Sequence, residues 1–198
     1  MSPTCGTPSD RRITAVLFTS NFITLDGVIG DPQIWHPAYA SEESVTMLAE
    51  QIDADDTAMV IGRATYDGFV SYWPDQDDTV PMARRTNEIK KWVVTSDPAP
   101  LGWNNSSIVE GEPMDGIRRL KGQGGDLFVP GSATLVAGLL AAGLVDEMRF
   151  YLDPFIYGHG RRLLDEGVPA TAFELVDERA LPHGVRYLAY RVDAAARG

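Results

Sequence analysis

Two glycine-containing segments of the sequence can bind an anion, because each lies where a predicted buried strand gives way to a helix. They are Gly62 to Tyr66 (GRATY) and Val129 to Thr134 (VPGSAT). Free backbone N–H groups at a helix start bind phosphate, and the helix dipole adds about 0.3–2 kcal/mol. Arg63 adds a cation to the first segment, and Ser132 and Thr134 add hydroxyls to the second. Together they suit the pyrophosphate of a dinucleotide, although each alone is more simply explained as an ordinary turn.

Other polar and aromatic residues can complete such a site. Thr95–Ser96 closes a third predicted strand with hydroxyls, and Asp26–Gly27 is typical of a tight turn. Glu42–Glu43 follows Ser41 at a predicted helix start and most simply stabilises the helix dipole. The alternative is that one of these glutamates faces the pocket as a proton source. Four aromatic residues either line a pocket for a planar heterocycle or belong to the core, with the core favoured for at least two: Trp35, Tyr66, Tyr72 and Trp73.

Several common functional signatures are absent from the sequence. No Gly-x-Gly-x-x-Gly follows a strand, and there is no Gly-Lys-Ser/Thr loop and no Gly-x-Ser-x-Gly elbow. His36, His159 and His183 are scattered and form no metal-ligand spacing with the single Cys5, so we expect no metal site and no covalent hydrolase. The net charge of −11 repels nucleic acids and anionic lipids, so we expect neither as a partner.

The composition is that of a globular protein in a reducing compartment. The chain has 198 residues, of which 44% are hydrophobic, and is long enough to bury a core without disulfides. We expect a flexible N-terminal tail over 1–11 and a single domain over 12–195. Cys5 has no partner in the chain, and the tail lacks the apolar core of a signal peptide. No apolar run approaches the roughly 18 residues that span a bilayer, so we expect a cytoplasmic location.

The elements that must position these residues alternate between strand and helix and then become strands alone. Strands are predicted at 13–20, 58–61, 91–95, 107–109 and 127–129, and helices after Ser41 and at 63–69, 114–121 and 131–142. Three consecutive strands follow at 147–152, 173–176 and 185–190. The alternation predicts an α/β fold with a mostly parallel central sheet, to which the last strands add in antiparallel orientation.

Taken in order, these motifs resemble the dihydrofolate reductase superfamily, and most closely the bacterial bifunctional deaminase–reductase C-terminal domain family. The matching segments are 24–29 (TLDGVI), 60–66 (VIGRATY), 92–96 (WVVTS) and a longer stretch that begins with 126–133 (DLFVPGSA) and ends near residue 160, and the likeness extends over 12–192. The resemblance implies a three-layer dihydrofolate reductase-like fold, usually dimeric. It also implies an NADPH-dependent oxidoreductase that transfers hydride to a pterin-like or aminopyrimidine substrate, as in folate reduction or riboflavin biosynthesis.

The resemblance also assigns roles to individual residues. The cofactor phosphates and pyrophosphate would be held by Gly62, Arg63, Thr65, Thr95, Ser96, Gly131, Ser132, Ala133 and Thr134. Asp26 and Gly27 would border the nicotinamide and the substrate. We assign Asp26 and Glu43 as catalytic, and Gly27, Trp35 and Tyr66 as substrate-binding.

The sequence departs from the family pattern at two places. Riboflavin-pathway reductases usually have an acidic residue before the glycine pair that follows the Leu-Phe-Val strand. Here that residue is Pro130, and Ser132 replaces the second glycine. The segment Ile34-Trp35-His36-Pro37 is longer than its counterpart in dihydrofolate reductases. The substrate therefore stays open.

Our main hypothesis is an NADPH-dependent reductase. One alternative is a nucleotide-binding or regulatory protein of the same fold without turnover, and another is a protein that binds folate analogues. We expect a homodimer formed through the C-terminal strands, since their apolar residues suggest a surface that is covered on both sides. We also expect Arg63 to set a preference for NADPH over NADH through the 2′-phosphate.

Overall fold

The computed structural model describes residues 15–97, 99–164 and 167–193 and contains one eight-stranded mixed sheet. The strand order is β4-β3-β2-β5-β1-β6-β8-β7, and neighbours from β4 to β6 pair in parallel. Strand β8 pairs antiparallel with both β6 and β7. The predicted combination of a parallel sheet and antiparallel C-terminal strands is confirmed. The strands are β1 Leu17–Thr24, β2 Ala58–Gly62, β3 Lys90–Val94, β4 Ser106–Ile108, β5 Leu127–Pro130, β6 Glu147–Asp153, β7 Phe173–Ala180 and β8 Arg186–Val192.

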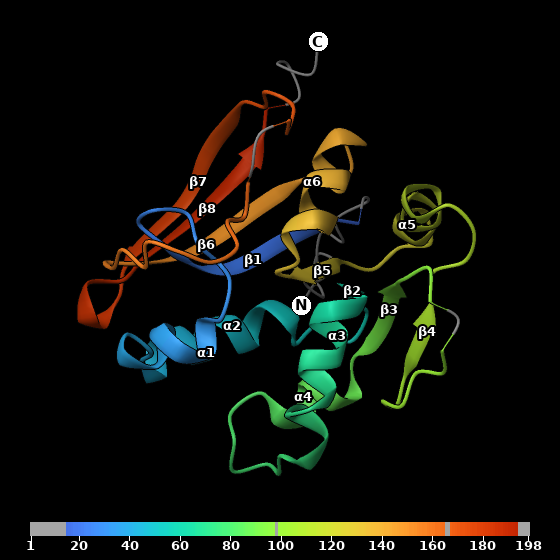
Figure 1. Cartoon of the computed structure of the whole chain (residues 1–198), viewed down its shortest axis with the longest axis horizontal. Coiled ribbons are helices and arrows are strands. Elements are labelled where there is room, and N and C mark those ends of the chain that lie inside the picture. The colour runs from blue at the N-terminus through green and yellow to red at the C-terminus, as the bar shows by residue number, and fades with distance from the viewer. Residues whose placement is uncertain (1–14, 98, 165–166, 194–198) are drawn as a thin grey trace, which may run out of the picture.

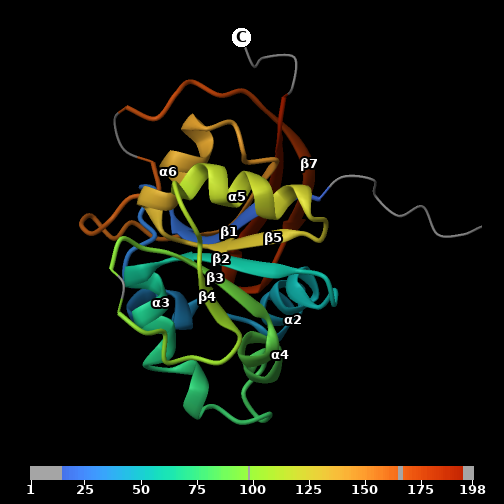
Figure 2. The same ribbon diagram turned by 90° about the vertical axis from the view of Figure 1, so that its right-hand side faces the viewer.

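Helices cover both faces of the sheet and complete three layers. Helices α5 and α6 lie on one face and α1 to α4 on the other (Figures 1 and 2). Within the described part of the chain, none of the helices has the length and apolar character needed to cross a membrane. The helices are α1 Pro32–Trp35, α2 Glu42–Ile52, α3 Arg63–Val70, α4 Ala83–Glu88, α5 Pro113–Gly122 and α6 Ala133–Ala141.

The helix starts follow local capping chemistry. Ser41 caps α2 as predicted, since its hydroxyl accepts the N–H of Ser44 and the Ser44 hydroxyl accepts the N–H of Ser41. Helix α6 begins at Ala133 rather than at the predicted Gly131, because Gly131 and Ser132 have positive φ angles of 71° and 66°. The short helices α1 and α4 were not predicted, since four and six residues give too little periodicity to detect.

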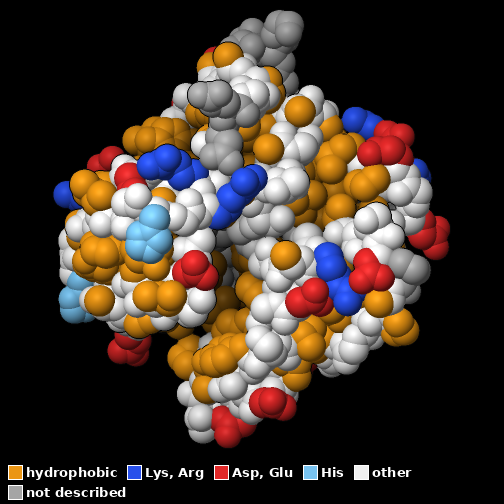
Figure 3. Space-filling view, in the orientation of Figure 1, with side chains coloured by type: hydrophobic (Ala, Val, Ile, Leu, Met, Phe, Trp, Pro, Cys, Tyr) orange, Lys and Arg blue, Asp and Glu red, His pale blue; other side chains and the backbone are white. Residues whose placement is uncertain are grey.

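Strand β1 occupies residues 17–24 rather than the predicted 13–20, and Ile13 and Thr14 lie outside the described residues, as do Cys5 and the predicted tail. The later end of β1 matters for the site. Its pairing with β5 stops at Ser20 and Pro130, whereas its pairing with β6 continues to Thr24 and Asp153. The carboxyl end of β1 therefore projects beyond β5. Figure 3 shows that this face of the molecule is hollowed along its middle, between the side that carries β6, β8 and α1 and the side that carries α3.

The core is divided by the sheet. One apolar cluster lies against α5 and α6, and includes Val136 and Leu139 of the almost entirely apolar α6. The other face packs against α2 and α3 through residues such as Ile52 and Tyr66.

Lys91 is fully buried on this second face of the sheet. Its ammonium group donates to the carbonyls of neighbouring residues and lies 4.0 Å from the centre of the Trp103 ring. These contacts compensate part of the cost of burying its charge.

Candidate functional site

The two glycine-containing segments meet at the carboxyl edge of the sheet. They follow the neighbouring strands β2 and β5, and a Cβ atom on Gly62 would lie only 2.7 Å from Ser132 Oγ. Gly131 has a left-handed backbone that favours glycine, and Ser132 adopts the same region at a cost of about 1 kcal/mol. The structure thus brings the starts of α3 and α6 to one place, with little side-chain bulk between them.

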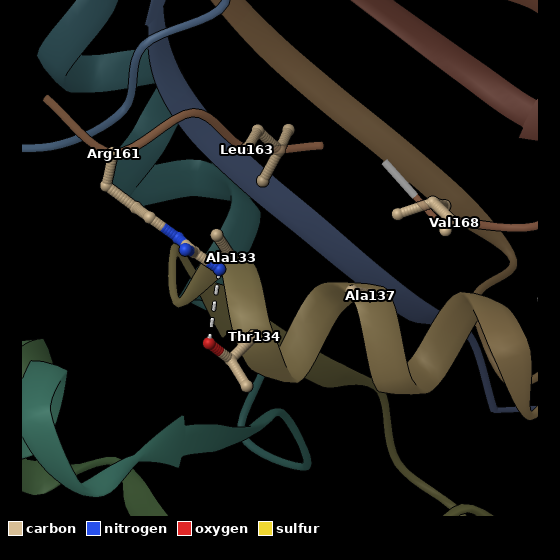
Figure 4. Close-up of a pocket in the computed structure, with 7 residues that line it drawn as sticks. Ala133, Thr134, Ala137, Arg161, Leu163 and Val168 are labelled. Atoms are coloured by element: carbon tan, nitrogen blue, oxygen red, sulfur yellow. Dashed lines mark hydrogen bonds between the residues drawn. The ribbon is translucent and has the colours of Figure 1, made fainter. Parts of the chain in front are cut away.

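A shallow pocket of about 340 Å³ opens beside the start of α6 (Figure 4). The Arg161 side chain reaches across to this helix, and its Nη2 donates to Thr134 Oγ1 at 3.4 Å. Arg161 therefore adds a cation to a helix start that already favours anions. Arg161 belongs to a loop after β6, and no motif in the sequence points to it. The pocket is lined by Ala133, Thr134, Ala137, Arg161, Leu163, Gly167 and Val168.

Arg63 lies at the start of α3 but is already paired with acidic residues. Its Nε donates to Asp67 Oδ1 at 2.9 Å and Oδ2 at 3.1 Å, and its Nη1 lies 3.5 Å from Asp97 Oδ2. Asp97 belongs to the loop after β3, where the Thr95 hydroxyl accepts its backbone N–H. Thr65 is half-buried on α3 and Ser96 is exposed. The predicted phosphate-binding residues of β2 and β3 thus lie together, with two carboxylates among them.

Several buried polar atoms of β1 and of the end of β6 have no hydrogen-bond partner. Among the described residues, Ser20 Oγ, Asn21 Oδ1 and Asp153 Oδ1 are buried and accept or donate no hydrogen bond. Asn21 faces the second glycine segment, since a Cβ on Gly131 would lie 3.9 Å from its Oδ1. Burying a polar atom without a partner costs about 1–3 kcal/mol, so each such atom is typical of a place where a ligand or water supplies the partner.

A buried histidine–aspartate pair lies at the same end of the sheet. His36 Nδ1 is 2.8 Å from Asp153 Oδ2, and the Asp153 side chain is 0% exposed. The His36 ring stacks on Phe22 of β1 with ring centres 3.6 Å apart. Neither partner of this pair is among the residues that the sequence predicts for the site. The only local hint was a histidine next to Trp35 in the turn-rich segment after β1.

The carboxylate of Asp26 accepts three hydrogen bonds, which tie the turn after β1 to the loop at Tyr157 and Gly158. The Thr24 hydroxyl donates to its Oδ1 at 2.6 Å, and the N–H groups of Tyr157 and Gly158 donate to its two oxygens. The Thr24 hydrogen bond, with help from the two backbone N–H groups and against partial desolvation, lowers the pKa of Asp26 to about 2. Asp26 is therefore ionised at neutral pH, and Gly27 beside it has a φ of 81° that suits glycine.

The remaining predicted residues differ in exposure. Trp35 is 5% exposed and its Nε1 donates to the Gly30 carbonyl at 2.8 Å. Tyr66 is 2% exposed, and its hydroxyl accepts the Trp103 N–H within the core. These two rings are therefore buried in the core, which is the alternative that the sequence favoured for at least two of the four aromatic residues. Contact of either ring with a substrate stays a prediction. Glu43 is exposed on the first turn of α2, and its role as a proton source also stays a prediction.

Known proteins of similar sequence and structure share this architecture. The protein YyaP of Bacillus subtilis, which is uncharacterized, is 24% identical over 174 residues, covering 85% of this chain and 90% of its own. The crystal structure of a putative riboflavin biosynthesis protein from Shewanella sp. PV-4 has a TM-score of 0.70 at 20% identity, covering 90% of this chain and 99% of its own.

Dihydrofolate reductase from Enterococcus faecalis, in complex with NADP(H), has a TM-score of 0.60 at 16% identity over 90% of this chain and 96% of its own. At these identities the solved structures show that the fold is dihydrofolate reductase-like. The family model described as the RibD C-terminal domain matches residues 15–187, which is most of the sequence. The chain therefore belongs to the RibD C-terminal domain family.

Proposed function

We propose that this protein is a reductase that binds NADPH along the carboxyl edge of its sheet and reduces a flat nitrogen heterocycle of the pterin or aminopyrimidine class. The family consists of NADPH-dependent reductases. The observation that carries the proposal for this chain is the buried, unpartnered Oδ1 of Asn21, which lies beside Gly131 where Gly62 and Ser132 approach each other closely.

The cradle fits the pyrophosphate of the cofactor. The close approach of Gly62 and Ser132 leaves backbone N–H groups at the starts of α3 and α6 with little side-chain cover. Arg161 provides a further positive charge at the α6 side. These are the features by which proteins commonly hold a phosphate group: helix starts, small residues and a forked cation.

The nicotinamide end fits the projecting end of β1. Asn21 Oδ1 is a buried acceptor beside Gly131, and a carboxamide N–H₂ is the kind of donor that would satisfy it. When bound, the cofactor supplies the hydride. This chain's own residues then orient the two rings, exclude water and deliver the proton.

His36 is the residue we assign to proton delivery. Asp153 forms a hydrogen bond with Nδ1 of the His36 ring, which fixes the orientation of the ring. Nε2 is then left to exchange a proton with a bound heterocycle. Phe22 supports the ring from one side. Asp26 is unsuited to this task, because its carboxylate is ionised and engaged by three donors.

The test is cofactor binding followed by turnover. NADPH at about 100 times its dissociation constant should stabilise the fold by about 2.7 kcal/mol, a shift of roughly 5–10 °C for a chain of this length. Asn21→Leu should reduce that shift. Gln51→Leu is the matched control, since Gln51 Oε1 is also buried and unpartnered but lies on α2 beside Tyr151. Unchanged NADPH binding in Asn21→Leu would show that Asn21 is not part of the cofactor site.

NADPH oxidation over a panel of pterins and aminopyrimidines tests the reductase itself. His36→Gln should lower kcat with little change in cofactor affinity. The second candidate is a protein that binds NADPH or antifolates without turnover. It is favoured because position 130 is a proline and not an acidic residue, and because the Asp26 carboxylate already accepts hydrogen bonds within the protein. Tight binding of a diaminopyrimidine with no NADPH oxidation across the panel would establish this second candidate.

We also propose that the protein is a homodimer formed through its C-terminal strands. Strand β7 is the edge of the sheet, and its Leu175 and Val176 are 44% and 38% exposed. These two side chains would be covered if this edge paired with the same edge of a second chain. Light scattering should give twice the chain mass of 21.6 kDa, and a single-chain mass at micromolar concentration would exclude the dimer.

A further inference from the structure

A row of four aromatic rings borders the proposed reacting position and bears on the substituent that the substrate carries, an inference that rests on the proposed function. Tyr39 lies between α1 and α2, and its ring centre is 6.1 Å from that of Phe155 in the loop after β6. The ring centres of Phe155 and Tyr157 are also 6.1 Å apart, and His159 closes the row at 4.0 Å from Tyr157. Successive rings are inclined by only 37°, 40° and 32°, so they form one continuous aromatic surface.

None of the four rings is fully buried. Tyr39, Phe155 and Tyr157 are half-buried, and His159 is exposed. Further apolar surface adjoins the row, since Leu25 is 58% exposed and its N–H donates to the Phe155 carbonyl at 2.8 Å. Hydrophobic side chains gather on the side of the hollow that carries β6 and α1 (Figure 3). Apolar surface that is concentrated beside a hollow is typical of a place that a ligand covers.

The row begins next to His36, to which we assign proton delivery. The Tyr39 N–H donates to the His36 carbonyl at 2.8 Å. Phe155 follows Asp153, the partner of His36, by two residues at the end of β6. The cofactor cradle, where α3 and α6 begin, lies on the other side of β1 in the strand order, at β2 and β5. A heterocycle bound between the cofactor and His36 would therefore extend its substituent over the row.

The row offers a substituent aromatic faces rather than positive charge. The Asp26 carboxylate lies directly against its loop, because it accepts two backbone N–H groups there, at 3.2 and 2.9 Å. Arg162 Nε donates to the Asp26 carbonyl at 2.9 Å, so these two charges balance each other. Arg161 is directed to the start of α6, where its Nη2 donates to Thr134 (Figure 4). An aryl group would gain ring contacts on this surface, whereas a phosphate group would gain no net attraction from the Asp26–Arg162 pair.

We propose that Tyr39, Phe155, Tyr157 and His159 are specificity-determining residues that bind an aromatic substituent of the heterocycle. The preferred substrate is then a flat ring that carries an aryl tail, and not one that carries a phosphorylated sugar. The tail stacks on Phe155 and Tyr157 while the heterocycle stays at His36.

The test is steady-state NADPH oxidation with three substrates. Two are dihydropterins that differ only in their substituent, a methyl group or a para-aminobenzoyl tail, and the third is an aminopyrimidine that carries a phosphorylated ribose. The aryl-tailed dihydropterin should have the lowest KM, about tenfold below that of the methyl-substituted one, the equivalent of two aromatic contacts.

Phe155→Leu and Tyr157→Leu remove one ring each and keep an apolar side chain. Each should raise KM for the aryl-tailed substrate about two- to tenfold, the equivalent of one lost aromatic contact. The kcat should stay within about twofold, because the tail contributes the same binding energy before and during the reaction. KM for the methyl-substituted substrate should not change. Phe155→Tyr keeps a ring and should retain the low KM for the aryl-tailed substrate.

Tyr72→Leu is the matched control. Tyr72 is also an exposed tyrosine in contact with another ring, 5.1 Å from that of Trp73. It follows the C-terminal end of α3, whereas the cradle lies at the start of that helix. The substitution should leave KM for both dihydropterins unchanged. A variant that merely disturbs the fold would raise KM for both dihydropterins alike.

Two results would overturn the inference while leaving the proposed reductase intact. One is a KM for the methyl-substituted dihydropterin, or for the phosphorylated aminopyrimidine, as low as that for the aryl-tailed substrate. The other is a KM for the aryl-tailed substrate that does not change when Phe155→Leu and Tyr157→Leu are combined. Oxidation of NADPH with none of the three substrates would instead remove the proposed function, and this inference with it.

Discussion

Replacing Gly62 by alanine probes the contact on which the cofactor cradle depends. The added Cβ would lie 2.7 Å from Ser132 Oγ, a separation that real Cβ atoms essentially never show. Because the Ser132 side chain is short and can rotate, the clash is partly relieved, and we expect a loss of about 1–2 kcal/mol in the free energy of unfolding. For a chain of this length that corresponds to a fall in Tm of roughly 2–8 °C.

Gly68→Ala is the control for this substitution. Gly68 lies in the same helix α3, and no heavy atom would come within 4 Å of its Cβ. Alanine should therefore gain about 0.5–1 kcal/mol from its better helix propensity. Replacing glycine by alanine should therefore lower the free energy of unfolding at position 62 and raise it at position 68.

Ser132→Gly should rescue Gly62→Ala. Glycine removes the clashing hydroxyl and tolerates the φ of 66° at position 132. Urea unfolding followed by tryptophan fluorescence gives the free energies of both single variants and the double variant, and we expect a coupling of about 1–2 kcal/mol. Two results would refute the close contact between Gly62 and Ser132. One is a Gly62→Ala protein as stable as Gly68→Ala, and the other is a double variant no more stable than Gly62→Ala.

Three other side chains make stability depend on charge. Asp153→Ala breaks a buried pair with His36 and should cost about 3–5 kcal/mol in urea unfolding; a loss below 1 kcal/mol would contradict the pairing. Burial, with smaller help from nearby cations, lowers the pKa of Lys91 to about 8. The unfolded chain then binds more protons between pH 8 and its own lysine pKa of 10.5, so stability should rise from pH 8 to about 10.5, and this slope should disappear in Lys91→Met. Because the pKa of Asp26 is lowered to about 2, its contribution to stability should be lost as the pH falls from about 4 to 2, and Asp26→Asn should lack that loss.

Local sequence determined much of the fold. Short apolar runs bounded by polar residues identified the strands, because burial on both faces demands such runs whatever their neighbours. The cap at Ser41 and the proline at the start of α5 identified two helix starts, because these signals act within one turn. The alternation of elements then favoured the parallel sheet, and with it a site where the carboxyl ends of β2 and β5 lie side by side.

Only the tertiary structure decided which partners each candidate residue has. The carboxylate of Asp26, a predicted catalytic residue, accepts hydrogen bonds from a loop far along the chain. His36 meets Asp153 across 117 positions, and Arg63 meets Asp97 from the loop that follows the neighbouring strand β3. Such contacts depend on strand order and on where each strand stops, which are settled by packing of the whole sheet. No short segment carries that information, so residue types predicted the kind of site while the fold determined its charge and its partners.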